Sequence, residues 1–248
     1  MFDVEDRERI RELLIEKARS DSRVVAAAAV GSSASGSDRW SDLDLTFGVA
    51  SGVPVAAVLE TWTQTLVADF DAVVLFDLPV RSTIYRVFLL PGVLQVDLSF
   101  TPAAEFGALG PRFRLLFGEA VEHPPAPPPS LESMFGLGVH HAVRAHLCIE
   151  RRRLWQAEYW IHEARDQALS LACRRVGLEM SHGRGFDSLP PAVRDRMAGA
   201  LVRSLTVEEL RRALAVTTAG LLREASDIPE VVSRLRPMLE ELCRPAPI

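Results

Sequence analysis

Apolar and polar residues follow three different patterns in the first fifty residues, and each pattern predicts a different element. Apolar residues at helical spacing, among them Ile10 and Leu14, predict a helix from a cap at Asp3 to about Ser20. Val24 to Val30 is wholly apolar and stops at Gly31, which is typical of a buried strand. The segment 42–49 alternates acidic with apolar residues and then becomes apolar, so it predicts a second strand.

The pattern up to residue 100 continues to mix helix and strands. Residues 53–68 predict a helix, and three strand-like runs follow at 72–76, 84–90 and 93–100. The short Pro91-Gly92 junction predicts that the last two runs form a hairpin. The segment GSSASGSDRWS, residues 31–41, is rich in glycine and serine and predicts a loop between the first two strands.

The chain changes character at residues 123–129, HPPAPPP, which cannot continue a helix or a central strand. We therefore predict a first domain at 1–122, a proline-rich linker at 123–129 and a second domain at 130–248. The second domain is helical throughout, with predicted helices at 132–150, 152–176, from about 189, at 206–225 and from about 227. Pro237 should kink or split the last of these helices. The fold class is thus α+β, in which a mixed sheet with flanking helices is followed by an all-helical bundle.

Composition narrows the function classes. The chain has 248 residues, 48% of them hydrophobic and 25% charged, which is ordinary for a globular protein, and its formal net charge is -5. A protein that holds long nucleic acid needs a basic surface, so the acidic balance disfavours that substrate. No apolar run approaches the length of a membrane span, and three widely spaced cysteines suggest reduced thiols. We expect a cytoplasmic protein without a membrane partner, and the sequence leaves its oligomeric state open.

Three aspartates are the candidate chemical groups. Asp42 and Asp44 are one residue apart in a predicted strand, so their side chains should project from the same face. Two such carboxylates repel each other unless a cation lies between them, and Mg²⁺ prefers carboxylate and phosphate oxygens. Asp97 is the one acid in an otherwise apolar strand, VLQVDLSF, where burial of a lone carboxylate is costly. If the two strands are neighbours, three carboxylates meet at one point.

The turn after the first strand supplies a second candidate group. Gly31 leaves a buried strand and is followed by Ser32, and a glycine at such a place lets backbone amides approach phosphate oxygens closely. The seryl hydroxyl can donate to the same oxygens.

A strand, Gly31-Ser32, nine further residues and then Asp42-Leu43-Asp44-Leu45 resemble the signature of the polymerase-β-like nucleotidyltransferases. The resemblance implies that Gly31 and Ser32 contact the triphosphate, that Asp42 and Asp44 bind metal ions, and that Asp97 is the third acid. The order of a small catalytic domain and a helical domain is similar to the antibiotic nucleotidyltransferases that act on aminoglycosides or lincosamides.

The same resemblance implies a reaction. A nucleoside monophosphate would pass from a nucleoside triphosphate to a hydroxyl of a small acceptor, with two Mg²⁺ ions. ATP is the expected donor because it is abundant, although no residue identifies the base. Asp97 would be a metal ligand or the general base, and both roles stay open.

Asp97, the helical part and the function each have a second interpretation. Asp97 could be a structural partner of Arg86 on the neighbouring strand. In the helical part, Glu158, His162 and Arg165 lie near one helical face, where a solvated salt-bridge surface is the default interpretation. An alternative function is an antitoxin-like or regulatory nucleotidyltransferase that modifies or binds a protein partner.

Overall fold

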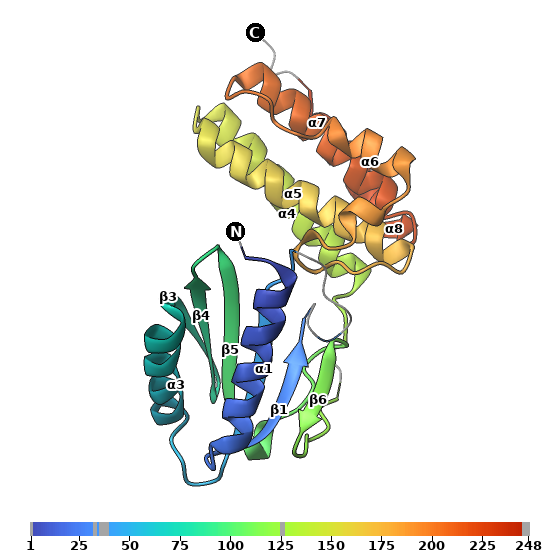
Figure 1. Cartoon of the computed structure of the whole chain (residues 1–248). Helices are drawn as coiled ribbons and strands as arrows, with labels where there is room; N and C mark the ends of the chain where they lie inside the picture. The colour runs from blue at the N-terminus through green and yellow to red at the C-terminus, as the bar shows by residue number, and fades with distance from the viewer. Residues whose placement is uncertain (1, 32–33, 35–39, 125–126, 245–248) are drawn as a thin grey trace. The chain divides into compact units, whose positions relative to one another are not determined.

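The computed structural model describes residues 2–31, 34, 40–124 and 127–244, and the chain forms two compact units (Figure 1). The first unit is Met1–Ala126 and the second is Pro127–Ile248, so the division falls within the proline-rich segment. The fold class is α+β, as predicted: a mixed sheet with helices is followed by an all-helical unit.

The first unit is built on a six-stranded sheet with the order β3-β4-β5-β2-β1-β6. The central pair, β2 and β5, is parallel, and every other pair is antiparallel. The predicted hairpin is confirmed, since β4 and β5 are joined through Pro91, Gly92 and Val93. The strands are β1 (Val24–Val30), β2 (Leu43–Val49), β3 (Val73–Val80), β4 (Thr83–Leu90), β5 (Leu94–Pro102) and β6 (Phe113–Phe117).

Two helices, α1 (Val4–Ser20) and α3 (Val55–Phe70), pack on one face of this sheet. The alternation in β2 puts Leu43, Leu45 and Phe47 on this face, where all three are fully buried. The ring of Phe47 lies 4.7 Å from that of Trp62 and 5.1 Å from that of Phe100. The helix-covered face is therefore a dry aromatic and aliphatic core.

The ends of α1 and α3 follow from single residues. The Asp3 carboxylate accepts a hydrogen bond of 2.8 Å from the backbone N–H of Asp6, as an N-cap does. α3 ends at Asp71, which adopts a left-handed conformation with φ 52°. The predicted helix at 53–68 is confirmed with a shift of two residues.

Two strands depart from the sequence-based expectation. β6 was not predicted, because its five residues are exposed or half-buried and show no clear alternation. It pairs with β1 through backbone hydrogen bonds, and such pairing does not require a particular pattern of apolar and polar side chains. β3 runs to Val80 instead of residue 76 and is the other edge strand, with all eight residues exposed.

The described residues of the second unit form five α-helices: α4 (Leu131–Glu150), α5 (Leu154–Arg175), α6 (Pro191–Ala198), α7 (Val207–Glu224) and α8 (Pro229–Leu242). Its core is rich in alanine, with Ala142, Ala164 and Ala168 fully buried, so the helices approach each other closely. The Thr206 hydroxyl caps α7 by accepting from the Glu209 N–H at 3.2 Å, at the start of the helix predicted for 206–225. Pro237 does not split the last helix, because α8 continues through it to Leu242.

Of the helices in the described part of the chain, none combines the length and the apolar character that crossing a membrane would require.

Candidate metal and phosphate site

The structure brings the three predicted aspartates together. One carboxylate oxygen each from Asp42, Asp44 and Asp97 lies within 4.8 Å of the other two, and all three side chains are half-buried. Asp44 and Asp97 are direct neighbours in the register of the parallel pair β2 and β5. The sheet itself therefore fixes the distance between two of the three acids, because parallel strands lie about 4.8 Å apart.

Asp42 is placed differently from the prediction. The sequence suggested that Asp42 and Asp44 both belong to one strand, whereas β2 begins at Leu43 and Asp42 is the residue before it. Both carboxylates nevertheless converge, since each places an oxygen in the same three-acid cluster. Position 42 thus depends on the entry loop as well as on the sheet.

Arg7 of α1 holds that entry point and was not identified from the sequence. Its guanidinium is buried, with 2% exposure, and its Nη1 donates to the backbone carbonyl of Ser41 at 3.3 Å. A signal was present, because Arg7 lies on the same helical stripe as the buried residues Ile10 and Leu14. A charged residue on the buried side of a helix indicates a polar partner nearby, because a buried charge is costly unless it is hydrogen-bonded or paired.

Asp97 is half-buried, and the pKa of its carboxyl is perturbed. Burial raises the pKa of the Asp97 carboxyl above its usual value, a hydrogen bond from Gln95 opposes that rise, and the charge of Asp42 adds to it. The Gln95 Nε2 donates to Asp97 Oδ1 at 3.0 Å. Such a carboxylate gains from a cation, because the cation offsets both the lost hydration and the repulsion from Asp42.

The interpretation of Asp97 as a partner of Arg86 is wrong. Arg86 lies opposite Leu98 in the register, so it projects from the helix-covered face. There its Nε and Nη2 donate to the two carboxylate oxygens of Asp77, at 2.6 and 2.7 Å. Arg86 also donates to the Thr63 hydroxyl of α3 at 2.7 Å.

Gly31 packs directly against the acids. It has a φ of 59°, a conformation that glycine adopts without strain. A Cβ added at this position would lie 2.4 Å from Asp44 Oδ2, so no other residue fits unless the carboxylate moves. The predicted phosphate turn therefore begins beside the acid cluster, on its β1 side. Ser32, the second residue of that prediction, lies outside the described residues.

A small hollow of about 270 Å³ opens beside Asp42 and Gln95. Phe2, Trp40 and Val93 complete its lining, and Trp40 is 65% exposed. The acid cluster is thus reached from the surface, as a site that exchanges ligands requires.

The donor set fits divalent cations. Among the described residues, the cluster consists of three carboxylates without a thiol or an imidazole, which is the oxygen-only chemistry that Mg²⁺ and Mn²⁺ prefer. Of the described residues, no other group of three acidic, histidine or cysteine side chains meets in this way.

His162 and Arg165, two of the helical residues considered from the sequence, contact each other within α5. Arg165 is buried and donates to the Ala200 carbonyl at 3.4 Å and to the ring of His162. It therefore ties α5 to the segment after α6.

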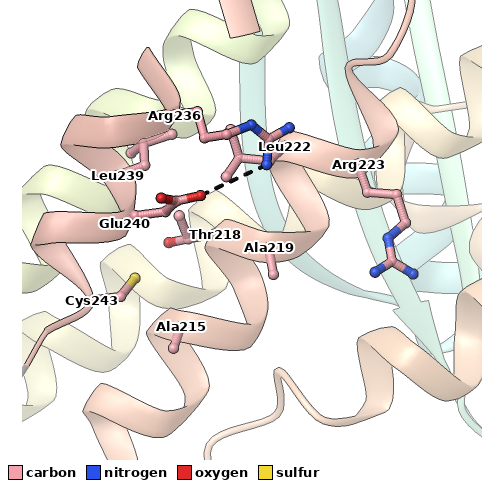
Figure 2. Close-up of a pocket in the computed structure, with 9 residues that line it drawn as sticks. All are labelled: Ala215, Thr218, Ala219, Leu222, Arg223, Arg236, Leu239, Glu240 and Cys243. Atoms are coloured by element: carbon pink, nitrogen blue, oxygen red, sulfur yellow. Dashed lines mark ion pairs between the residues drawn. The ribbon is translucent and has the colours of Figure 1, made fainter. Parts of the chain in front are cut away.

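A groove of about 480 Å³ does lie between α7 and α8 (Figure 2). An ion pair of 3.9 Å between Arg236 and Glu240 spans part of its rim, and Cys243 lines one end. Glu240 is the only carboxylate among its described lining residues, so the groove offers no cation site of the kind found in the first unit.

Comparisons with known proteins add little to these observations. No protein-family model matches the chain, and no curated protein matches it. Among solved structures, an aminoglycoside 6-adenyltransferase from Bacillus subtilis aligns over 94% of this chain and 96% of its own, with 12% sequence identity and a TM-score of 0.42. A TM-score below 0.5 does not establish a shared fold.

Proposed function

We propose that the chain is a divalent-metal-dependent nucleotidyltransferase that transfers a nucleoside monophosphate, AMP from ATP, to a hydroxyl of a small acceptor. The observation that carries the proposal is the convergence of Asp42, Asp44 and Asp97 within 4.8 Å, directly against the left-handed turn at Gly31. Carboxylates for cations and a glycine turn for phosphates are the two parts that nucleotidyl transfer needs in one place.

The roles of the residues follow from their positions. Asp42 and Asp44 would hold two Mg²⁺ ions, which when bound neutralise phosphate charge and lower the pKa of the attacking hydroxyl. The backbone amides at and after Gly31 would hold the phosphates of the donor. Gln95 keeps the Asp97 carboxylate oriented through its 3.0 Å hydrogen bond.

The reaction balances without a further reactant. The acceptor oxygen bonds to the α-phosphorus, the bond from that phosphorus to the bridging oxygen breaks, and pyrophosphate leaves. The hydroxyl proton passes to Asp97 or to water, so Asp97 acts either as the general base or as a third cation ligand.

The test is Mg²⁺-dependent release of pyrophosphate from each nucleoside triphosphate, in the presence of aminoglycosides, lincosamides, nucleosides and a cell extract. We expect release that needs one acceptor and disappears in Asp42→Asn. Asp69→Asn, which removes an exposed carboxylate on α3, is the matched control and should keep full activity.

Absence of release with every acceptor, from a protein that still binds ATP, would contradict transfer to a small molecule. A pull-down for a protein partner would then test the antitoxin-like or regulatory alternative.

A further inference from the structure

A second, larger cavity lies on the same face of the sheet as the three acids. Its volume is about 830 Å³, within the range of small-molecule sites, and its floor is made by Thr46, Tyr85 and Thr101. Thr46 is two residues beyond Asp44 on β2, and Thr101 is four beyond Asp97 on β5. Since side chains alternate, these residues share the face of the acids, and the floor begins about 7 Å from them.

The roof of this cavity is held in place by specific bonds. The segment 105–111 lies over the sheet, and the backbone N–H of Val121 donates to the Phe106 carbonyl at 2.7 Å. His123 Nε2 is 3.0 Å from the Glu105 carbonyl oxygen. Phe106 is itself almost fully buried. All the described lining residues belong to the first unit, so the cavity is a property of that unit alone.

The chemistry of the lining is that of hydroxyl groups over an apolar wall. The Thr83 and Thr101 hydroxyls are 2.8 Å apart and hydrogen-bonded to each other. Burial raises the pKa of the Tyr85 phenol, so it stays protonated and can donate at neutral pH. Val80 and Leu109 contribute apolar surface.

The lining carries almost no net charge. Glu105 is the only carboxylate among its described residues, and it already accepts a hydrogen bond of 2.5 Å from the Ser82 hydroxyl. Arg81 supplies one positive charge beside it. A polycationic ligand loses its hydration on binding, and several carboxylates would be needed to compensate for that loss. A hydroxylated ring with an apolar face instead matches the hydroxyl groups and the apolar side chains of this lining.

The position of the cavity fits the acceptor more closely than the nucleotide. Gly31 approaches Asp44 from the β1 side, while the cavity is built by β2, β5, β4 and β3, which extend to the other side of Asp44. In-line transfer requires the attacking oxygen and the leaving pyrophosphate to lie on opposite sides of the α-phosphorus. If the phosphates lie at Gly31, the acceptor approaches from the side of the cavity.

We propose that this cavity is the acceptor subsite and that the acceptor is a hydroxylated ring compound with no more than one positive charge, rather than a polycationic aminoglycoside. The proposal rests on the proposed function for the reaction at the acids, but binding in the cavity does not depend on turnover.

Two tryptophan substitutions on β3 test the subsite. Val80 lines the cavity and is 44% exposed, and Val73 is on the same strand, outside the cavity, and 61% exposed. Neither replacement removes a packed side chain. Val80→Trp should raise the KM for the acceptor at least about tenfold without changing the KM for the triphosphate, while Val73→Trp should change neither. Tyr85→Phe keeps the shape of the cavity but removes a hydroxyl, so it should raise the KM for the acceptor by a smaller factor.

The same variants are placed in the Asp42→Asn background, and binding of a lincosamide, a nucleoside and an aminoglycoside is measured by calorimetry without nucleotide. Binding of a neutral or singly charged compound that Val80→Trp removes and Val73→Trp preserves supports the subsite, even if no pyrophosphate is ever released. Turnover with equal KM values in the two tryptophan variants would overturn the subsite while leaving the transferase activity intact. Preference for the aminoglycoside, or no binding by any of the neutral or singly charged compounds, would overturn the acceptor class.

Discussion

The two faces of the sheet in the first unit are made by the same strands and have opposite characters. On one face, Leu45 and Phe47 pack with Trp62 under two helices. On the other, Asp44, Thr46 and Asp97 line the acid cluster and the neighbouring cavity. Because side chains alternate along a strand, β2 and β5 contribute packed apolar residues to one face and the acids with their polar neighbours to the other. The comparison predicts that substitutions on the two faces have separable effects.

The largest expected effect is on the open face. Asp44→Asn should lower turnover by about 10³-fold. The cation that Asp44 helps to hold should lower the activation free energy by several kcal/mol, and about 1.36 kcal/mol corresponds to a tenfold change in rate. The free energy of unfolding should change little, because the side chain is half-buried and removes no packing. Steady-state pyrophosphate release and urea denaturation measure the two quantities. Near-normal turnover would show that Asp44 holds no cation.

Phe47→Ala, three residues along the same strand, should have the opposite effect. Phe47 is fully buried between two aromatic rings, so its truncation should cost about 3–5 kcal/mol of unfolding free energy. Mg²⁺ affinity of the protein that remains folded should be close to that of the parent. Urea denaturation with and without Mg²⁺ checks both statements, and a selective loss of Mg²⁺ affinity would show that the two faces are not separable.

Gly31→Ala should lower both the stability and the Mg²⁺ affinity, because Gly31 has a left-handed backbone conformation and also packs against the acid cluster. The left-handed φ should cost about 1–2 kcal/mol of stability, and the new Cβ should displace the Asp44 carboxylate and weaken Mg²⁺ about 10–100-fold. Gly52→Ala is the matched control, since Gly52 has a φ of 79° and open space around it. It should show the same loss of stability with unchanged Mg²⁺ affinity. Equal Mg²⁺ affinity in the two variants would remove Gly31 from the site.

The smallest expected effect is a pH dependence on the helix-covered side. Hydrogen bonds from Arg23 and Trp62 lower the pKa of the Asp21 carboxyl in the folded protein. A lowered folded pKa stabilises the protein above the unfolded value, about 3.9, and this contribution is lost as pH falls below it. The Tm of thermal unfolding should therefore fall less steeply between pH 7 and pH 3 in Asp21→Asn than in the parent protein. Parallel curves would show that Asp21 is not linked to folding.

Much of this arrangement could be predicted from the sequence because it depends on local pattern. The wholly apolar run at 24–30 matches β1 without a shift in its bounds. The acids of β2 and β5 stand out as charges within apolar strands, which made Asp44 and Asp97 candidates for one site.

The remainder depends on non-local contacts that side-chain patterns do not record. β6 is held by backbone pairing alone, and the apolar sequence of β3 gives no sign that it forms an exposed edge. Arg7 contacts the carbonyl of Ser41, 34 residues away in the sequence, and no local pattern records that contact. The cavity arises where four strands meet a roof from residues 105–111, 123 and 124, so no single segment of the sequence predicts it.

The central claim is that the three carboxylates hold divalent cations for nucleotidyl transfer. The most direct measurement is a crystal structure of the full chain with Mn²⁺ and a non-hydrolysable ATP analogue, read by anomalous difference density. The account predicts Mn²⁺ coordinated by Asp42 and Asp44, beside Asp97, with the triphosphate at Gly31. Density for Mn²⁺ elsewhere, or an analogue bound without Mn²⁺ at the acids, would contradict it.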